Sequence, residues 1–255
     1  MKKLFNNFKA LVYQETRYKY PVSKKALKQL AKNLHIEMPI HNKGVFIDCG
    51  AFDGCSIIKF KIANPNFDCI SYEPNPKLWK YFKNLPTMLI KKGVSSENKT
   101  MDFRIDHIDA DGSSLIPTKK ILFNSPLEDS HITSIKIECV ELSSVIAELA
   151  NVYDCIVLKL DVEGAEYDIL EDLISKNLLI KLYKLYVEFH WQKCNFPEER
   201  HQKLISELKQ KVVFEDWDAL DFATYKRSKI IQLRRNITIK KNFSKINSRK
   251  YKFIN

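Results

Sequence analysis

The chain has 255 residues, of which 45% are hydrophobic and 29% are charged, a composition typical of a globular protein rather than a disordered one. No stretch reaches the roughly 18 uncharged apolar residues of a membrane helix, and the apolar run near the N-terminus is too short for a signal peptide, so we expect a cytoplasmic protein. The six cysteines contain no C-x-x-C pair, which favours buried free thiols over a zinc site.

The net charge of +11 is concentrated at the two ends of the chain. Residues 1–32 sum to +8 and residues 222–255 to +11, which leaves −8 for the part between them. This distribution, together with two amphipathic helical patterns before residue 35, predicts a helical appendage over residues 1–36, a folded domain over 37–235 and a basic tail over 236–255. The basic ends could dock an anionic or lipid-linked carrier, or they could serve only as solubilising tails.

The first motif in the chain is V-F-I-D-C-G-A-F-D-G at residues 45–54. An apolar strand ends in Asp48 and runs into a turn with Gly50 and Gly54, and residues 55–62 follow as a helix, which is the start of a βαβ unit. Such glycines let the backbone approach a bound group at the helix N-terminus. The spacing meets only half of the dinucleotide pattern, and the carboxylate of Asp53 would repel a pyrophosphate, so a cofactor with a cationic or hydroxyl-rich face fits better.

The second strand, at residues 67–73, ends in an acid. Glu73 follows the glycine turn by about twenty residues, where doubly wound folds place the carboxylate that binds both ribose hydroxyls. Pro74 and Pro76 end the strand there. Beyond it the pattern predicts a helix at 77–85, a strand at 88–94, extended segments at 101–105 and 135–140, a loop at 107–115 that could reach the pocket, and a helix at 142–149.

The segment C-I-V-L-K-L-D-V-E-G-A-E at residues 155–166 is the second motif. Its unbroken apolar run predicts a buried, parallel and central strand, and it ends in Asp161, Glu163 and Glu166. Carboxylates at that edge could be a general base, metal ligands or acids stabilised by a helix dipole. The segment itself offers only Lys159, on the strand, to pair with them.

A further strand at residues 182–191 places His190 at the same predicted edge, although a surface histidine is an alternative interpretation. A helix at 197–211 and strands at 212–215 and 228–233 complete an α/β pattern.

Four stretches taken together, residues 46–54, 72–76, 159–170 and 187–190, resemble the FkbM-type methyltransferases, and K-x-D-x-E-G-x-E at 159–166 is the most specific of them. The resemblance implies a Rossmann-like class I methyltransferase fold, with seven mostly parallel strands, one antiparallel strand and helices on both faces. It also implies S-adenosylmethionine as the cofactor. The cofactor-binding residues that it implies are Asp48, Gly50, Ala51, Phe52, Asp53, Gly54, Glu73 and Asp161.

The resemblance further implies methyl transfer to a hydroxyl of a sugar, a glycan or a glycosylated small molecule. Asp161, Glu163 and His190 are the candidate catalytic residues, with Asp161 and His190 as candidate bases. Asp161, Glu163 or Glu188 could instead hold a divalent cation.

Two other functions stay open. An RNA ribose 2′-O-methyltransferase would explain the basic ends, but it needs lysines around the strand-end acid, where the sequence indicates carboxylates and a histidine, so a nucleic-acid partner is disfavoured. A non-catalytic Rossmann-like binding protein is the third possibility. The sequence leaves the oligomeric state open.

Overall fold

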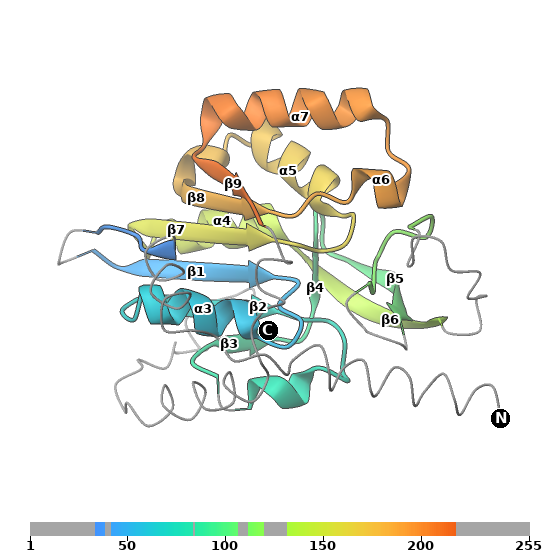
Figure 1. The fold of residues 1–255 in the computed structure, drawn as a ribbon, viewed down its shortest axis with the longest axis horizontal. Coiled ribbons are helices and arrows are strands. Elements are labelled where there is room, and N and C mark those ends of the chain that lie inside the picture. Colours follow the sequence, from blue (N-terminus) through green and yellow to red (C-terminus); the bar gives the residue numbers. More distant parts are fainter. Residues whose placement is uncertain (1–33, 39–41, 84, 107–111, 120–131, 218–255) are drawn as a thin grey trace, which may run out of the picture.

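The computed structural model of the chain describes residues 34–38, 42–83, 85–106, 112–119 and 132–217. Nearly all of the predicted N-terminal appendage, all of the basic tail and the predicted strand at 228–233 lie outside these residues. A parallel sheet of six strands runs through the centre of the molecule (Figure 1), in the order β3-β2-β1-β7-β8-β9. The bounds of its strands are β1 Gly44–Cys49, β2 Asp68–Tyr72, β3 Met88–Ile90, β7 Cys155–Leu160, β8 Leu182–Val187 and β9 Phe214–Asp216.

The order of the strands creates a crevice at the middle of the sheet. From β1 the chain winds outward to β2 and β3, and from β7 it winds outward in the other direction to β8 and β9. The direction of winding therefore changes between β1 and β7, which pair in parallel from Gly44 opposite Cys155 to Cys49 opposite Leu160. In open α/β sheets a ligand binds at such a switch point, outside the carboxyl ends of the strands.

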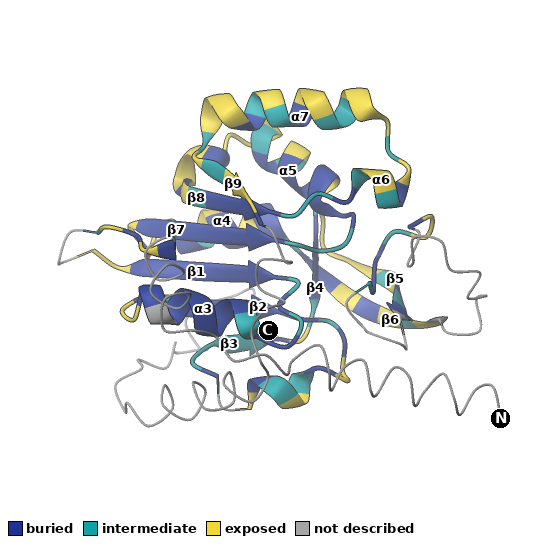
Figure 2. Cartoon of the chain, in the orientation of Figure 1, coloured by how far each residue is buried: buried dark blue, intermediate teal, exposed yellow. Residues whose placement is uncertain are grey.

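Helices cover both faces of the sheet. The helices are α3 Cys55–Ala63, α4 Leu142–Leu149, α5 Glu166–Ser175, α6 Trp191–Cys194 and α7 Glu198–Lys211, with single 3-10 turns at η1 Trp79–Phe82 and η3 Leu179–Lys181. On one face, Val45 and Ile47 of β1 pack in a core with the apolar sides of α4, α5 and α7. On the other face, Phe46 stacks on Phe60 of α3 with the ring centres 4.0 Å apart. Figure 2 shows β1 and β7 as continuously buried strands between these two layers.

Beside the main sheet, the chain forms a second, small sheet of three strands, in the order β4-β6-β5. Their bounds are β4 Gly93–Ser95, β5 Lys99–Asp106 and β6 Ile132–Glu141. The β5 and β6 strands are antiparallel, whereas β4 and β6 are parallel. The long β5–β6 ribbon extends away from the main sheet in Figure 1.

The α/β class, the mainly parallel sheet and the helices on both faces agree with the prediction from the sequence, but two details were wrong. The described residues contain six parallel strands and a small mixed sheet, and because the predicted strand at 228–233 lies outside them, the seventh, antiparallel strand stays a prediction. The predicted strand at 88–94 is two short strands in different sheets, because the chain turns away at Lys91 and Lys92. The predicted helix at 77–85 is a single 3-10 turn, since Pro86 disfavours a helical Leu85.

Within the described ranges, no helix is both long enough and apolar enough to cross a membrane.

Candidate active site

The turn after β1 is shaped by its two glycines. Gly50 and Gly54 have φ angles of +74° and +77°, which favour glycine over other residues. A Cβ atom on Gly50 would lie 1.7 Å from the carbonyl oxygen of Asp161, and one on Gly54 would lie 2.1 Å from Leu85 Cδ1. The expected reason for these glycines was the close approach of a bound group. In the structure they make room for the end of β7 and for the Leu85 side chain.

Glu73 stands at the end of β2 and is held by the backbone of this turn and of its own strand end. The Phe52 N–H donates to Glu73 Oε2 at 2.8 Å, and the Asn75 N–H donates to Oε1 at 2.7 Å. The residue is only 5% exposed. Burial raises the pKa of Glu73 to about 8, although the two N–H donors counteract part of that shift.

Asp53 lies in the same turn, where it serves the start of α3. Its Oδ1 accepts a hydrogen bond from the Cys55 N–H at 3.0 Å, which satisfies one of the free N–H groups of the first helical turn. A carboxylate at a helix N-terminus is favoured by the helix dipole. This contact gives the acid at position 53 a role in the start of the helix.

Asp48 and Lys159 form a buried pair below the turn. Ser56 donates a hydrogen bond to Asp48 Oδ2, and Asp48 Oδ1 lies 3.4 Å from Lys159 Nζ. Lys159 Nζ also donates to the carbonyl oxygen of Gly50 at 2.8 Å and lies 3.0 Å from Asp161 Oδ2. Burial alone would lower the pKa of Lys159, but the two aspartates outweigh it and raise the pKa, so the lysine stays charged.

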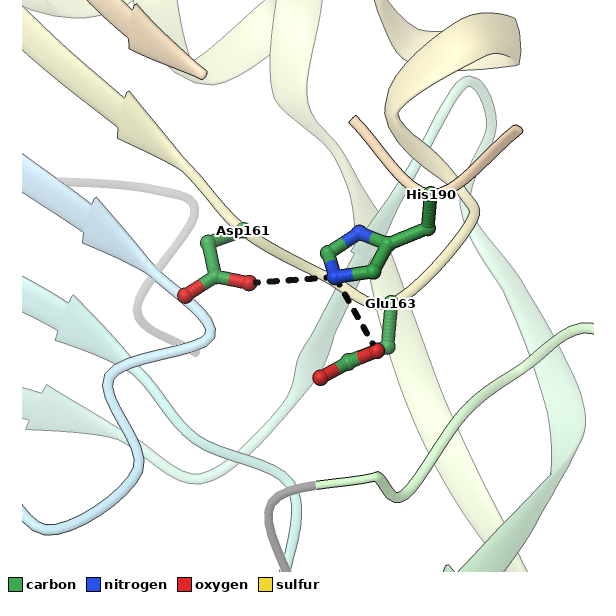
Figure 3. A group of neighbouring side chains, drawn as sticks. All are labelled: Asp161, Glu163 and His190. Atoms are coloured by element: carbon green, nitrogen blue, oxygen red, sulfur yellow. Dashed lines mark ion pairs between the residues drawn. The ribbon is translucent and has the colours of Figure 1, made fainter. Parts of the chain in front are cut away.

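At the ends of β7 and β8 a second group of side chains surrounds His190. The ring of His190 is 1% exposed, and Figure 3 shows it facing Asp161 and Glu163. Its Nε2 atom lies 3.2 Å from Glu163 Oε2, 3.4 Å from Glu188 Oε1 and 3.9 Å from Asp161 Oδ1. The structure therefore brings the three predicted catalytic residues together, with Glu188 beside them.

Glu166 holds this histidine from the other side. The His190 Nδ1 atom lies 3.0 Å from Glu166 Oε1, which also accepts hydrogen bonds from the N–H groups of Val162 and Gly164. Glu166 is completely buried. A hydrogen bond from Nδ1–H to Glu166 leaves Nε2 as the atom that faces the other carboxylates.

Sequence reasoning missed Lys119 and Ser114, which reach the cluster from the segment between β5 and β6. Lys119 Nζ forms an ion pair with Glu163 Oε2 and a 3.0 Å hydrogen bond to the carbonyl oxygen of Gly112. Ser114 donates to the carbonyl oxygen of Glu163 at 2.5 Å. The expectation of an edge with only carboxylates and a histidine was therefore wrong, since Lys119 and Lys159 both contact it. The only signal in the sequence was the loop at 107–115.

Burial and the neighbouring charges shift the pKa values of the residues in the cluster in different directions. Burial alone would raise the pKa of Asp161, but Lys159 and His190 outweigh it and lower the pKa. Burial raises the pKa of Glu163 despite the opposing effects of His190 and Lys119. For His190, burial is outweighed by the surrounding glutamates, which raise its pKa to about 10. With no cation among these carboxylates, a pKa this high does not favour the imidazole as a base near neutral pH.

A groove lies beside the cluster, between α7 and the ends of β8 and β9. Its walls contain aromatic residues together with amide and charged side chains, among them Glu188, Trp191, Gln202, Lys209, Asp216 and Trp217. Glu188 belongs to both the groove and the cluster, and the Trp217 ring centre lies 5.7 Å from Lys159 Nζ. The groove therefore borders the side chains at the edge of the sheet.

Comparison with known proteins identifies one family. The sequence model of the methyltransferase FkbM domain matches residues 48–215, which is more than half of the chain and contains both the turn after β1 and the His190 cluster. No curated protein and no solved structure matches the chain.

Proposed function

This chain belongs to the methyltransferase FkbM domain family, and from that premise we propose that it transfers a methyl group from S-adenosylmethionine to a hydroxyl of a sugar, a glycan or a glycosylated small molecule. The observation that carries the proposal is the convergence of Asp161, Glu163 and His190 at the switch point of the sheet. Side chains that can align a hydroxyl and accept its proton lie there beside the expected cofactor turn.

The residues around the turn fit a cationic cofactor. Asp48 is completely buried, and the one charged group in contact with its Oδ1 atom that the described residues show is the Lys159 ammonium, at 3.4 Å. Together with Asp161, Asp48 gives this edge of the sheet a negative character that suits the sulfonium and ammonium groups of S-adenosylmethionine and would repel a pyrophosphate. We assign the methionine part of the cofactor to the turn at residues 50–54 and to Asp48 and Asp161.

Glu73 suits the ribose. Each of its carboxylate oxygens accepts one backbone N–H and keeps a lone pair for a further donor, so two adjacent hydroxyl groups can be bound together. Asn75, two residues further on, carries a buried Nδ2 without a hydrogen-bond partner. Bound S-adenosylmethionine would supply an electrophilic methyl group on a sulfonium.

In our proposal Asp161 orients the acceptor hydroxyl and takes its proton. Lys159 fixes the position of this carboxylate through its contact with Oδ2, which leaves Oδ1 on the side of His190. The contribution of the protein is thus mainly alignment, which needs a carboxylate that cannot rotate freely.

The groove next to Glu188 supports a sugar-like acceptor. Trp191 and Trp217 offer apolar rings, and Gln202, Lys209 and Asp216 offer hydrogen-bonding groups along the same walls. A sugar presents both an apolar face and many hydroxyl groups, so it matches a groove that is lined by both kinds of side chain.

The test is calorimetry with S-adenosylhomocysteine, followed by turnover with a panel of glycosides. We expect Glu73→Ala to weaken binding about 10–100-fold, because the hydrogen bonds between the ribose hydroxyls and the Glu73 carboxyl oxygens are lost. Asp161→Asn should reduce turnover at saturating cofactor by about 10²–10⁴-fold. Glu171→Gln, an exposed carboxylate on α5, serves as the matched control. No binding by the wild-type chain would refute the proposal.

RNA ribose is a second candidate acceptor, favoured by the two lysines that contact the carboxylate edge. A steep dependence of RNA binding on salt concentration would support it. Turnover on glycosides without any on RNA would exclude it.

A further inference from the structure

The His190 Nε2 atom is buried and has no hydrogen-bond partner. His190 is 2% exposed, and its Nε2 has no partner in hydrogen-bond geometry, although carboxylate oxygens of Asp161, Glu163 and Glu188 lie within 3.9 Å of it. Figure 3 shows the ring with the first two of these carboxylates. Glu188 Oε2, in the same cluster, is also buried and without a hydrogen-bond partner. Buried polar atoms are normally satisfied, so two unpaired atoms on neighbouring residues of one cluster indicate a ligand there.

From this arrangement we propose that the cluster is a divalent-cation site. The ligands are His190 Nε2, Asp161 Oδ1 and a carboxylate oxygen of Glu163, with Glu188 available as a fourth.

The distances suit a shared ion. One ligand atom from each of Asp161, Glu163 and His190 can be chosen so that all three lie within 4.8 Å of one another, and the contacts of Nε2 are 3.2, 3.4 and 3.9 Å. Ligands about 2.1 Å from a metal and at right angles to each other are roughly 3.0 Å apart, and wider angles give larger separations. A small cation therefore fits among these atoms with little movement of the side chains.

Glu166 supplies the arrangement that is typical of a metal-bound histidine. Such a histidine usually donates its other ring N–H to a carboxylate, which fixes the tautomer and aims the free nitrogen at the metal. Glu166 contacts Nδ1 at 3.0 Å and is itself anchored by two backbone N–H groups, so it cannot move to the other side of the ring.

The balance of charge also favours a cation. Asp161, Glu163, Glu166 and Glu188 bring four carboxylates to the histidine, whereas the ammonium groups that contact them are those of Lys119 and Lys159. Lys159 occupies Asp161 Oδ2 and leaves Oδ1 toward the cluster. Lys119 shares Glu163 Oε2, and a carboxylate has enough lone pairs to serve both a lysine and a cation.

The mix of one imidazole and several carboxylates points to a first-row ion such as Mn²⁺, Fe²⁺ or Zn²⁺ rather than Ca²⁺. Resting on the proposed methyl transfer, the role of this ion is to bind the acceptor hydroxyl and lower its pKa, so that a carboxylate can remove the proton. The oxygen of the acceptor would then be held at the edge where Asp161 stands.

The experiment is a titration of the full chain, purified with a chelator, with Mn²⁺ while the spectrum of free Mn²⁺ is followed by electron paramagnetic resonance. We expect one bound ion per chain, with a ¹⁴N coupling from an imidazole in the pulsed spectrum. His190→Gln should remove the ¹⁴N coupling. Glu166→Gln, which changes only the positioning residue, should weaken binding by roughly 10–100-fold. Glu163→Gln should weaken it at least as much.

The matched control is Glu141→Gln, which removes a carboxylate that pairs with Lys176 away from the cluster, and it should leave Mn²⁺ binding unchanged. Absence of binding, or binding that survives both Glu163→Gln and His190→Gln, would overturn the proposal. Calorimetry with S-adenosylhomocysteine in the presence of chelator separates the two ideas. Cofactor binding without Mn²⁺ binding refutes only the metal site, and Mn²⁺ binding without cofactor binding refutes only the methyltransferase.

Discussion

The two halves of the candidate site hold their carboxylates in different ways. In the turn after β1, Glu73 and Asp53 accept hydrogen bonds from backbone N–H groups a few residues away or on the neighbouring turn. At the ends of β7 and β8, Asp161 and Glu163 are held by the charged side chains of Lys159, Lys119 and His190. The first half depends on the path of the backbone, whereas the second depends on a balance of charges.

The difference between the two halves is tested most directly at Lys159, because its ammonium group contacts Asp48 in the first half and Asp161 in the second. Lys159→Met should lower the free energy of unfolding by about 3–5 kcal/mol, because Asp48 and Asp161 would be left as unpaired buried charges. Lys184→Met on the adjacent strand is the control, since its partner Glu215 is exposed and the loss should be under about 1 kcal/mol. Urea unfolding measures both, and similar losses would contradict a special role for Lys159.

A second test addresses the path of the backbone. Gly50→Ala should destabilise the protein by about 3 kcal/mol, because the added Cβ combines a positive φ with a clash against the carbonyl of Asp161. Gly93→Ala is the comparison and should cost less, since the three atoms nearest to its added Cβ belong to the side chains of Cys139, Ile137 and Leu115 rather than to the backbone. Thermal unfolding of the two variants would contradict the prediction if Gly93→Ala were the less stable.

The pH dependence of stability tests the burial of Glu73 in the first half of the site. The folded-state pKa of Glu73, about 8, lies above its ordinary value of 4.5, so the folded protein keeps a proton that the unfolded chain releases. This contribution to stability is complete below about pH 4.5 and is lost as the pH rises toward 8. Glu73→Gln should flatten that decline by about 3 kcal/mol. Urea unfolding of the wild-type protein and of Glu73→Gln at pH 5 and pH 8 tests this prediction. An equal loss of stability between the two pH values in both proteins would contradict the raised pKa of Glu73.

The smallest effect is expected for an exposed ion pair. Lys176 contacts Glu141 and Asp172 and is 40% exposed, so Lys176→Ala should cost less than about 1 kcal/mol, and less again in high salt. Thermal unfolding at low and high salt provides the measurement. A loss of stability as large as that of Lys159→Met would show that burial does not decide how much an ion pair of this protein contributes to stability.

Most of the fold and part of the site could be predicted from local patterns. The strands before Asp48, Glu73 and Asp161 are apolar runs that end in an acid, and the structure places these strands side by side in a parallel sheet. Because the carboxyl ends of parallel strands share one edge, the meeting of Asp161 with His190 also followed from the sequence.

What could not be predicted depends on contacts between distant segments. Lys119 reaches Glu163 only because residues 112–119 lie against the segment that follows β7, and no spacing in the sequence encodes that contact. Glu166 has the pattern of a helix N-terminal acid, and its role as the partner of His190 appears only when β8 is in place. The split of residues 88–94 between two sheets likewise depends on tertiary pairing.

The small sheet has a consequence for how such a chain could diversify. The segment between Ser95 and Glu141 begins and ends at neighbouring positions, because these two residues are paired on the adjacent strands β4 and β6. A segment whose two ends lie next to each other can change in length or be exchanged as one cassette without displacing β1, β2 or β7. Ser114 and Lys119, which contact Glu163, belong to that same segment. An exchange of the segment between related enzymes would therefore replace these two residues of the site and leave the residues at the ends of β1, β2 and β7 unchanged.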